Sequence, residues 1–318
     1  MAEPELLTEV VEGVGVLRLN RPAAINALTV SMMAGMREAL EAWRDDDGVD
    51  SVLLLGEGSR GLCAGADVRA LRTAVLEGRD YGEFFDLEYG LDLAIKEYPK
   101  PYEARQHGIT MGGGLGISAH GSRRLASADA AFAMPETIIG FTPDVGINWY
   151  LAHAPGWTGM HVALTGTTVG ARDGVLLGLA DEAPADAPAG ELEQNRSWID
   201  ACYSYPDPSD VIAALESHAD PRARAAAAQI RLRSPLSVAV TLEALRRVPA
   251  MSGVAEVLAQ DRVLADHMIG SPDFIEGVRA QLVDKDRAPR WTHERIEDVT
   301  RAEVLACFRA EDPRSLAF

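Results

Sequence analysis

The sequence predicts an α/β fold followed by a helical C-terminal region. In the N-terminal part, short runs rich in valine and leucine alternate with segments whose apolar residues recur at helical spacing, a pattern typical of α/β proteins. From Val211 to Ala310 the helical spacing continues without a clear strand. The chain has 318 residues, of which 47% are hydrophobic, so it can bury a substantial core.

The first expected elements are a hairpin, a helix and a strand. Residues 10–20 read VVEGVGVLRLN, two β-rich runs around Gly13 and Gly15 that predict a hairpin. Apolar residues recur every three or four positions over 30–45, which predicts an amphipathic helix. A charged turn, DDDG, separates this helix from the run SVLLLGEG at 51–58, which predicts a strand.

Glycine-containing turns and further helices follow. The segment GLCAGADVRAL at 61–71 predicts a loop that enters a helix, and residues 84–98 predict another amphipathic helix. The segment PYEARQHGITMGGGLGISAHG at 101–121 predicts a strand, a glycine-rich turn and a buried helix. A strand is expected over AAFAMPE at 130–136, and the next helix is expected from about Asn148.

Two clusters of helix-breaking residues mark a candidate domain boundary. The composition shifts to APADAPAG at 183–190, and SYPDPSD at 204–210 forms the second cluster. The sequence therefore divides into an α/β core over 1–205 and a helical region over 206–318. The helical region is expected to cover the active site or to mediate association, which leaves a homo-oligomer open.

Composition excludes several classes of partner and site. The net charge of -18 disfavours binding to nucleic acid or to an anionic membrane surface. No run approaches the roughly 18 apolar residues of a membrane helix, and the first ten residues lack the pattern of a signal peptide, so a cytoplasmic protein is expected. Cys63, Cys202 and Cys307 lie far apart without CxxC spacing, which argues against disulfides and a zinc site. Cys63 is expected to be a small buried residue.

The run MGGGLG at 111–116 is the first candidate for chemistry. Backbone N–H groups at a glycine-rich turn can hold a phosphate or a developing oxyanion. No Gly-Lys-Ser/Thr follows the run, so a nucleotide-phosphate role is disfavoured. Taken alone, the glycines could equally serve close packing.

Four segments, in their order and spacing, resemble the crotonase, or enoyl-CoA hydratase/isomerase, superfamily. They are LNRPAAINALT (19–29), GLCAGADVRAL (61–71), HGITMGGGLGIS (107–118) and MPETIIGFTPDVG (134–146). A late segment, SPDFIEGVRAQLVDKDRAPRW (271–291), makes the chain most similar to the 3-hydroxyisobutyryl-CoA hydrolases. The resemblance covers nearly the whole chain. It implies a spiral of ββα units over the core, an acyl-CoA substrate, and neither a metal nor a separate cofactor.

The resemblance also assigns an oxyanion hole. In the superfamily, two backbone N–H groups bind the thioester carbonyl oxygen, and by motif position these belong here to Ala66 and Gly113. Donors that are fixed before the reaction lower the barrier, and glycine at 113 lets the backbone approach the substrate. Asp67, beside Ala66, is expected to cap the following helix.

Carboxylates decide what an oxyanion hole is used for. Hydratases of the superfamily carry two glutamates, and one of their positions is occupied here by Gly116. Glu136 matches the other glutamate, Asp144 matches the aspartate of the hydrolases, and Glu88 matches a further acidic position near their substrate. We expect Glu136 to act as a general base on water, or as a nucleophile through an anhydride. Asp144 then orients the water or the substrate hydroxyl.

Coenzyme A is a polyanion, so an acidic protein must meet its phosphates with local basic groups. Arg21 and Arg69, with the backbone around Ala24 and Asn26, are the expected contacts in the motifs. A second cluster of basic residues stands late in the chain: Arg279, Lys285, Arg287 and Arg290. Surface ion pairing is the alternative for any one of these side chains.

Three functions remain in competition. The first is hydrolysis of a short 3-hydroxyacyl-CoA such as 3-hydroxyisobutyryl-CoA, which belongs to valine breakdown. The second is an enoyl-CoA hydratase or isomerase with Glu136 as its sole acid/base, against which Asp144 and Gly116 argue. The third is a catalytically silent acyl-CoA-binding homologue, because Ile147 and Asn148 stand where the superfamily often has glycine.

Overall fold

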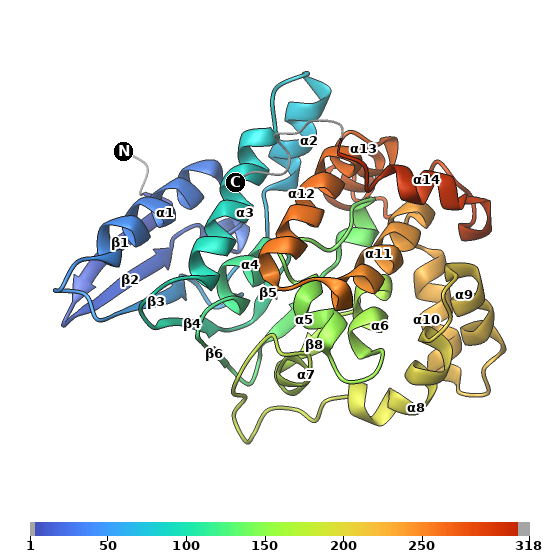
Figure 1. Cartoon of the computed structure of the whole chain (residues 1–318), viewed down its shortest axis with the longest axis horizontal. Helices are drawn as coiled ribbons and strands as arrows, with labels where there is room; N and C mark the ends of the chain where they lie inside the picture. Colours follow the sequence, from blue (N-terminus) through green and yellow to red (C-terminus); the bar gives the residue numbers. More distant parts are fainter. Residues whose placement is uncertain (1–3, 311–318) are drawn as a thin grey trace.

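The computed structural model describes residues 4–310 and contains two sheets (Figure 1). The strands are β1 (Leu6–Val11), β2 (Val14–Leu19), β3 (Ser51–Gly56), β4 (Tyr102–Gln106), β5 (Ile109–Met111), β6 (Arg123–Ala126), β7 (Ala131–Ala133) and β8 (Val169–Gly170). Five strands form the larger sheet in the order β1-β2-β3-β4-β6, and three form the smaller sheet in the order β5-β7-β8. Among the strand pairs of residues 4–310, β1–β2 and β7–β8 are antiparallel and the others are parallel.

Helices make up most of the remaining chain. The α-helices are α1 (Val30–Arg44), α2 (Val68–Leu76), α3 (Gly82–Lys96), α4 (Gly113–Ala119), α5 (Asn148–His153), α6 (Thr158–Thr165), α7 (Ala171–Leu176), α8 (Leu192–Tyr203), α9 (Pro208–Ser217), α10 (Pro221–Arg231), α11 (Pro235–Arg247), α12 (Val254–Ile269), α13 (Pro272–Val278) and α14 (Arg301–Ala306). Short turns of 3₁₀ or π type are η1 (Pro22–Ala24), η2 (Glu136–Ile139), η3 (Val248–Ala250), η4 (Arg279–Val283) and η5 (Ile296–Asp298).

The core repeats a unit of two extended segments and a helix. β1, β2 and α1 form the first unit, β4, β5 and α4 a later one, and β6, β7 and α5 the next. The segment after β3 joins the second layer, because Cys63 forms a bridge with Thr110 of β5. In each later unit the first strand therefore lies in the larger sheet. The second extended segment belongs to the smaller sheet (β5, β7) or, after β3, pairs with it through the Cys63 bridge. This arrangement confirms the predicted α/β fold and its ββα units.

Local chemistry explains the first unit. The β1–β2 turn places Gly13 at φ +81°, a conformation that glycine adopts without a steric penalty. Thr29 caps α1 by accepting a hydrogen bond from the Met32 amide. The apolar side chains of α1 form one buried face against the larger sheet, where Trp43 fills the space above Gly15. In Figure 1, α1 and α3 lie over this sheet.

Several C-terminal helices share one type of N-terminal cap. The helices α9, α10, α11 and α13 each start with proline after an Asp or Ser cap, and the cap side chain accepts a backbone hydrogen bond in every case. No strand occurs between residues 211 and 310, as predicted. No helix within residues 4–310 is long and apolar enough to span a membrane. The boundary near residue 205 stays a prediction; buried residues of both parts share one hydrophobic cluster.

Candidate active site

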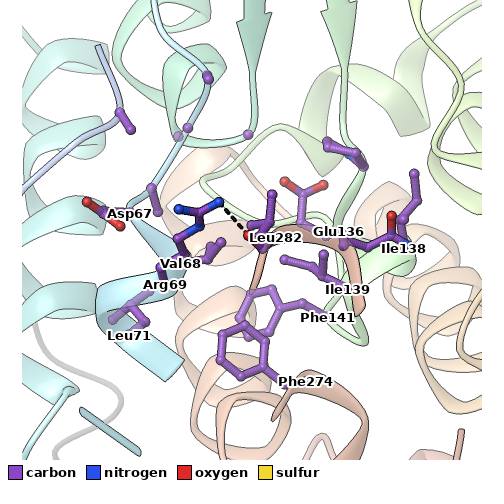
Figure 2. Close-up of a pocket in the computed structure, with 18 of the residues that line it drawn as sticks. Asp67, Val68, Arg69, Leu71, Glu136, Ile138, Ile139, Phe141, Phe274 and Leu282 are labelled. Atoms are coloured by element: carbon purple, nitrogen blue, oxygen red, sulfur yellow. Dashed lines mark hydrogen bonds between the residues drawn. The ribbon is translucent and has the colours of Figure 1, made fainter. Parts of the chain in front are cut away.

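A cavity of about 1450 Å³ lies between the ββα core and the C-terminal helices. Its lining combines segments far apart in sequence: the loops at 21–27 and 64–71, the turn at Gly112 and Gly113, η2 with the loop after it, and residues 281–291. Figure 2 shows α2 residues on one side, Glu136 with the residues of η2 on the other, and Leu282 between them. Both parts of the chain thus contribute to one cavity.

The backbone amides of Ala66 and Gly113 face the same space. The parallel bridge between Leu28 and Ala66 holds the first amide, and Gly113 is the first residue of α4. A Cβ atom built on Gly113 would lie 3.6 Å from the Ala66 nitrogen, so the two donors are neighbours. Within residues 4–310 neither amide donates a hydrogen bond to another protein group. Two adjacent free donors can bind one carbonyl oxygen.

Carboxylates crowd the glycine turn. A Cβ atom on Gly113 would lie 2.4 Å from Glu88 Oε1, and one on Gly112 would lie 2.9 Å from Glu136 Oε1. Gly112 also adopts φ +50°, which L-residues with side chains rarely adopt. Glycine at these positions therefore leaves room for the carboxylates as well as for the approach of a substrate to the backbone.

Glu88, Glu136 and Asp144 line the cavity and are almost inaccessible to solvent, with exposures of 2%, 8% and 6%. Burial, and then the charge of Asp144, raises the pKa values of Glu88 and Glu136. Burial also raises the pKa of Asp144 to about 7, against the hydrogen bond that Tyr89 donates to its Oδ2 at 2.7 Å. Three such carboxyl groups titrate as one system and can hold protons near neutral pH.

Two further carboxyl groups lie behind this set, and the sequence did not reveal their role. Asp92, on α3, is fully buried, and neither of its oxygens has a hydrogen-bond partner within the described residues. A Cβ atom on Gly116 would lie 2.8 Å from Asp92 Oδ1, so Asp92 occupies the space beside that glycine. Asp261, on α12, accepts a hydrogen bond from the Gly146 amide at 2.9 Å. The i, i+4 spacing of Glu88 and Asp92 in an apolar helix was the signal available in the sequence.

The expected coenzyme A contacts differ in their surroundings. Arg21, Ala24 and Arg69 line the cavity, whereas Asn26 is buried behind its wall. The Asn26 amide instead donates to the Leu62 carbonyl at 2.9 Å, and its Oδ1 accepts from the Arg21 amide. Asn26 therefore holds the loop in place and does not offer its side chain to the cavity.

Both expected arginines already have partners. The Arg21 guanidinium contacts Glu5 at 2.9 Å and Asp67 at 3.4 Å. Arg69 donates to the Leu282 carbonyl and thereby links α2 to η4 beside the cavity (Figure 2). The Asp67 side chain also accepts from the Ala70 amide, so the predicted role of Asp67 as the cap of α2 is confirmed.

The late basic cluster is divided. Arg279 is neutralised by Glu276, Asp284 and Asp286. Lys285 and Arg287 line the cavity, each at a left-handed backbone position, with φ +59° and +56°. These two residues, with no ion pair among the described residues, offer the positive charge that an anionic ligand requires.

Aromatic rings form the apolar part of the wall. Phe85, Phe141 and Phe274 line the cavity; Phe85 stacks on Phe141 with ring centroids 6.0 Å apart, and Phe141 meets Phe274 at 5.8 Å. In Figure 2, Phe141 and Phe274 lie below Glu136 and Ile139. Such a wall suits a short apolar acyl group.

Potential metal ligands do not cluster in the described chain, and the cysteine of the 61–71 segment is buried. No group of three or more His, Cys, Asp or Glu side chains within it could hold a metal ion. Cys63 is fully buried as predicted, and burial raises the pKa of its thiol to about 12, so the thiol stays protonated.

Comparison with known proteins identifies the family of this chain. The sequence model of the enoyl-CoA hydratase/isomerase family matches residues 14–187 and 181–308. The mitochondrial 3-hydroxyisobutyryl-CoA hydrolase of Danio rerio is 33% identical over 99% of this chain and 92% of its own length. The human enzyme of the same name is 32% identical over 100% of this chain and 92% of its own length.

Two solved structures share the fold over nearly their full length. A carnitinyl-CoA dehydratase from Mycobacterium thermoresistibile is 41% identical with a TM-score of 0.93, covering 98% of each chain. An enoyl-CoA hydratase from Rhodobacter sphaeroides is 34% identical with a TM-score of 0.95, covering 99% of this chain and 100% of the other. The resemblance inferred from the motifs is confirmed: this chain belongs to the enoyl-CoA hydratase/isomerase family.

Proposed function

We propose that the protein hydrolyses the thioester of a short 3-hydroxyacyl-CoA, of which 3-hydroxyisobutyryl-CoA is the representative. One observation carries the proposal: Glu136 and Asp144 line the same cavity as the paired amides of Ala66 and Gly113. The full-length similarity to 3-hydroxyisobutyryl-CoA hydrolases supports it.

The first step uses the amide pair. The thioester carbonyl oxygen accepts hydrogen bonds from Ala66 N–H and Gly113 N–H, which stabilise the negative charge that develops on that oxygen. Removing one such donor from an enzyme typically costs about 10²–10³-fold in rate. Because these donors are backbone groups held by the Leu28 bridge and by the start of α4, they need no rearrangement during the reaction.

Glu136 provides the base or the nucleophile. As a base, it takes a proton from water while the water oxygen bonds to the carbonyl carbon. The C–S bond then breaks, and the coenzyme A sulfur leaves as a thiol after taking up a proton. As a nucleophile, the Glu136 carboxylate attacks the carbonyl carbon, the C–S bond breaks, and coenzyme A leaves as a thiolate that takes up a proton from water. Water then cleaves the resulting anhydride, which releases the free acid and regenerates the carboxylate. Both routes consume one water and release a free acid and coenzyme A.

Asp144 and Glu88 complete the site. Asp144 orients the water or the 3-hydroxyl group of the substrate, and Glu88 lies beside the Gly113 donor. Burial, and then the charge of Asp144, raises the pKa values of Glu88 and Glu136, so both carboxyl groups hold a proton more readily than exposed glutamates do. The proposed substrate contacts are Arg21, Ala24 and Arg69, with Lys285 and Arg287 as added candidates for the phosphates.

Hydration or dehydration of an enoyl-CoA is the second candidate, because the two similar solved structures are those of a dehydratase and a hydratase. Against it, Gly116 itself supplies no carboxylate at the position where hydratases of the family carry a glutamate. A silent acyl-CoA-binding role is disfavoured by the complete set of amides and carboxylates.

A panel of acyl-CoA thioesters distinguishes these functions. Free thiol is measured as it forms, and the reaction is repeated in water labelled with ¹⁸O. Hydrolysis releases thiol and puts the label into the product carboxylate. Hydration releases no thiol and puts the label on a carbon-bound hydroxyl. Efficient hydration of crotonyl-CoA without thiol release would overturn the proposal, and binding without either reaction would favour the silent homologue.

The cytoplasmic location stays a prediction. The similar hydrolases of Danio rerio and human are named as mitochondrial enzymes, so the relatives do not support it.

A further inference from the structure

The backbone turn after Asp144 is held from two directions. Val145 adopts φ +50°, a left-handed conformation that is rare for a β-branched residue and persists only where neighbouring contacts hold it. The Val145 carbonyl accepts a hydrogen bond at 2.7 Å from Nε2 of His120, the residue that follows α4. The next amide, that of Gly146, donates to Asp261 on α12 at 2.9 Å. Asp144 is therefore attached to a fixed segment of backbone.

The same turn is closed locally. The Asn148 side-chain amide donates to the Pro143 carbonyl at 2.7 Å, so the residues on both sides of Asp144 are joined. Burial lowers the pKa of His120 to about 4, which keeps the ring neutral, with its proton on Nε2 for the Val145 carbonyl. With the backbone fixed, the side-chain torsions of Asp144 are the freedom that remains.

Tyr89 removes that freedom. Its hydroxyl donates to Asp144 Oδ2 at 2.7 Å, and its side chain is fully buried. The ring packs against Phe85, one turn earlier on α3, with centroids 5.7 Å apart, so the hydroxyl itself is rigidly placed. Glu88 stands on the same helix next to Tyr89 and reaches the glycine turn. One helix thus addresses both the amide side and the Asp144 side of the cavity.

We propose that Tyr89 is a positioning residue for thioester hydrolysis, which orients the Asp144 carboxylate by binding one of its oxygens and leaves the other oxygen for water or the substrate hydroxyl. The proposal rests on the proposed function in naming the reaction. The geometric part, a tyrosine that sets the orientation and charge of Asp144, does not depend on which acyl-CoA is consumed.

The proposal predicts a change in pH dependence. Several ionisable side chains surround Asp144: Glu88, Tyr89 and Asp92 on α3, Glu136 on η2 and Asp261 on α12, with His120 behind Val145. Among them Tyr89 donates to the Asp144 side chain, and this hydrogen bond opposes the effect of burial on the pKa of Asp144. Loss of a hydrogen bond to a charged group shifts such a pKa upward by about one to two units.

The test is Tyr89→Phe, which keeps the ring and removes the hydroxyl. We expect kcat to fall by about 10–100-fold, the range of a lost hydrogen bond to a charged group, with KM changed by less than about twofold. The limb of the pH–rate profile that belongs to Asp144 should move to higher pH by about one to two units. Tyr203→Phe is the matched control, because Tyr203 is also fully buried and its hydroxyl contacts His161 at 2.8 Å outside the cavity. That control should leave the profile unchanged.

A double-mutant cycle shows whether Tyr89 acts through Asp144. In an Asp144→Asn background, Tyr89→Phe should cause less than about twofold further loss of residual activity, because the shared interaction is already altered. The Asp144→Asn background also allows the test if Tyr89→Phe alone fails to fold. With asparagine at 144, loss of the Tyr89 hydroxyl leaves no buried carboxylate without its hydrogen-bond donor. Additive losses, or an unshifted pH profile in folded Tyr89→Phe, would overturn the proposal.

A measurement without turnover separates this proposal from the hydrolase assignment. Unfolding of substrate-free wild type and Tyr89→Phe is followed from pH 5 to pH 9. The destabilisation by Tyr89→Phe should grow as the pH rises through about 7, because the ionised form of Asp144 is the one that loses its donor. If this growth is seen but no acyl-CoA releases thiol, the hydrolase assignment fails while the role of Tyr89 stands. A destabilisation that is equal at all pH values would refute the role of Tyr89.

Discussion

The two sides of the cavity are built in different ways. The amide side uses backbone groups of Ala66 and Gly113, each at a glycine-containing turn within a short motif. The carboxylate side combines Glu88 from α3 with Glu136 and Asp144 from η2 and the loop after it. A backbone donor keeps the same chemistry in any surroundings, whereas burial and mutual repulsion change what a carboxylate does. The amide side is therefore defined by geometry and the carboxylate side by environment.

The largest effect is expected on the carboxylate side. Glu136→Gln keeps the shape of the side chain but removes the base or nucleophile, and kcat should fall by about 10³-fold or more. Thiol release under saturating substrate measures the loss. Glu182→Gln, at an exposed glutamate paired with Arg123, is the control and should retain wild-type activity. A Glu136→Gln variant that keeps a tenth of the activity would remove Glu136 from this role.

Gly113→Val tests the amide side. A Cβ atom at this position would collide with Glu88 Oε1 and stand beside the Ala66 amide, so turnover should fall by at least about 10²-fold. The helical circular dichroism should stay largely intact. Gly170→Ala is the matched control, because a Cβ atom there meets nothing within 4 Å. Near-normal turnover in Gly113→Val would show that this turn does not bind the carbonyl oxygen.

Asp144→Asn should lower hydrolytic activity and raise the free energy of unfolding above neutral pH. The pKa of Asp144 in the folded protein, about 7, lies above its ordinary value of 3.8, so the folded state is penalised as the pH rises through that interval. Asparagine removes the penalty. Most hydrolysis should be lost, while the free energy of unfolding should increase at pH 8 and stay nearly unchanged at pH 4.

Chemical denaturation at pH 4, 6 and 8 measures this dependence. Asp129→Asn is the control, because the pKa of this exposed carboxylate is shifted in the opposite direction. The hydrogen bond from the Ser127 hydroxyl is the main reason that its pKa is lowered. Its removal should not increase stability at pH 8. Destabilisation of the protein by Asp144→Asn at pH 8 would contradict the prediction. It would show that the folded protein stabilises the ionised Asp144 carboxylate and does not raise its pKa.

The smallest expected effect concerns ligand binding at Arg69. Arg69→Ala should raise KM by about threefold to tenfold and change kcat less, as expected when the substrate and the transition state lose the same contact. The increase should shrink as the salt concentration rises. Arg79→Ala is the control, since Arg79 pairs with Glu77 on the surface. An unchanged KM would leave Arg69 with its structural bond to Leu282 alone.

Local patterns predicted the fold well, since its elements depend on short-range chemistry. The β1–β2 hairpin, α1 and the helix after the glycine turn all occur where apolar spacing and glycine placed them. The same holds for the cap at Asp67. The surroundings of Asn26 and Arg279 could not be predicted. The sequence does not show that Asn26 is buried behind the cavity wall or that three carboxylates surround Arg279.

The residues around Asp144 could not be predicted from the sequence. Tyr89 lies on α3, His120 directly follows α4, and Asp261 lies on α12. Nothing in their local spacing shows that they meet at one turn. The motifs carry the glycines and the two principal carboxylates, because backbone conformation is decided by neighbours in the chain. Proton affinities and side-chain orientations are decided by the packing of α3, α4 and α12 around those motifs, because they depend on burial and on charges that only the folded chain brings together.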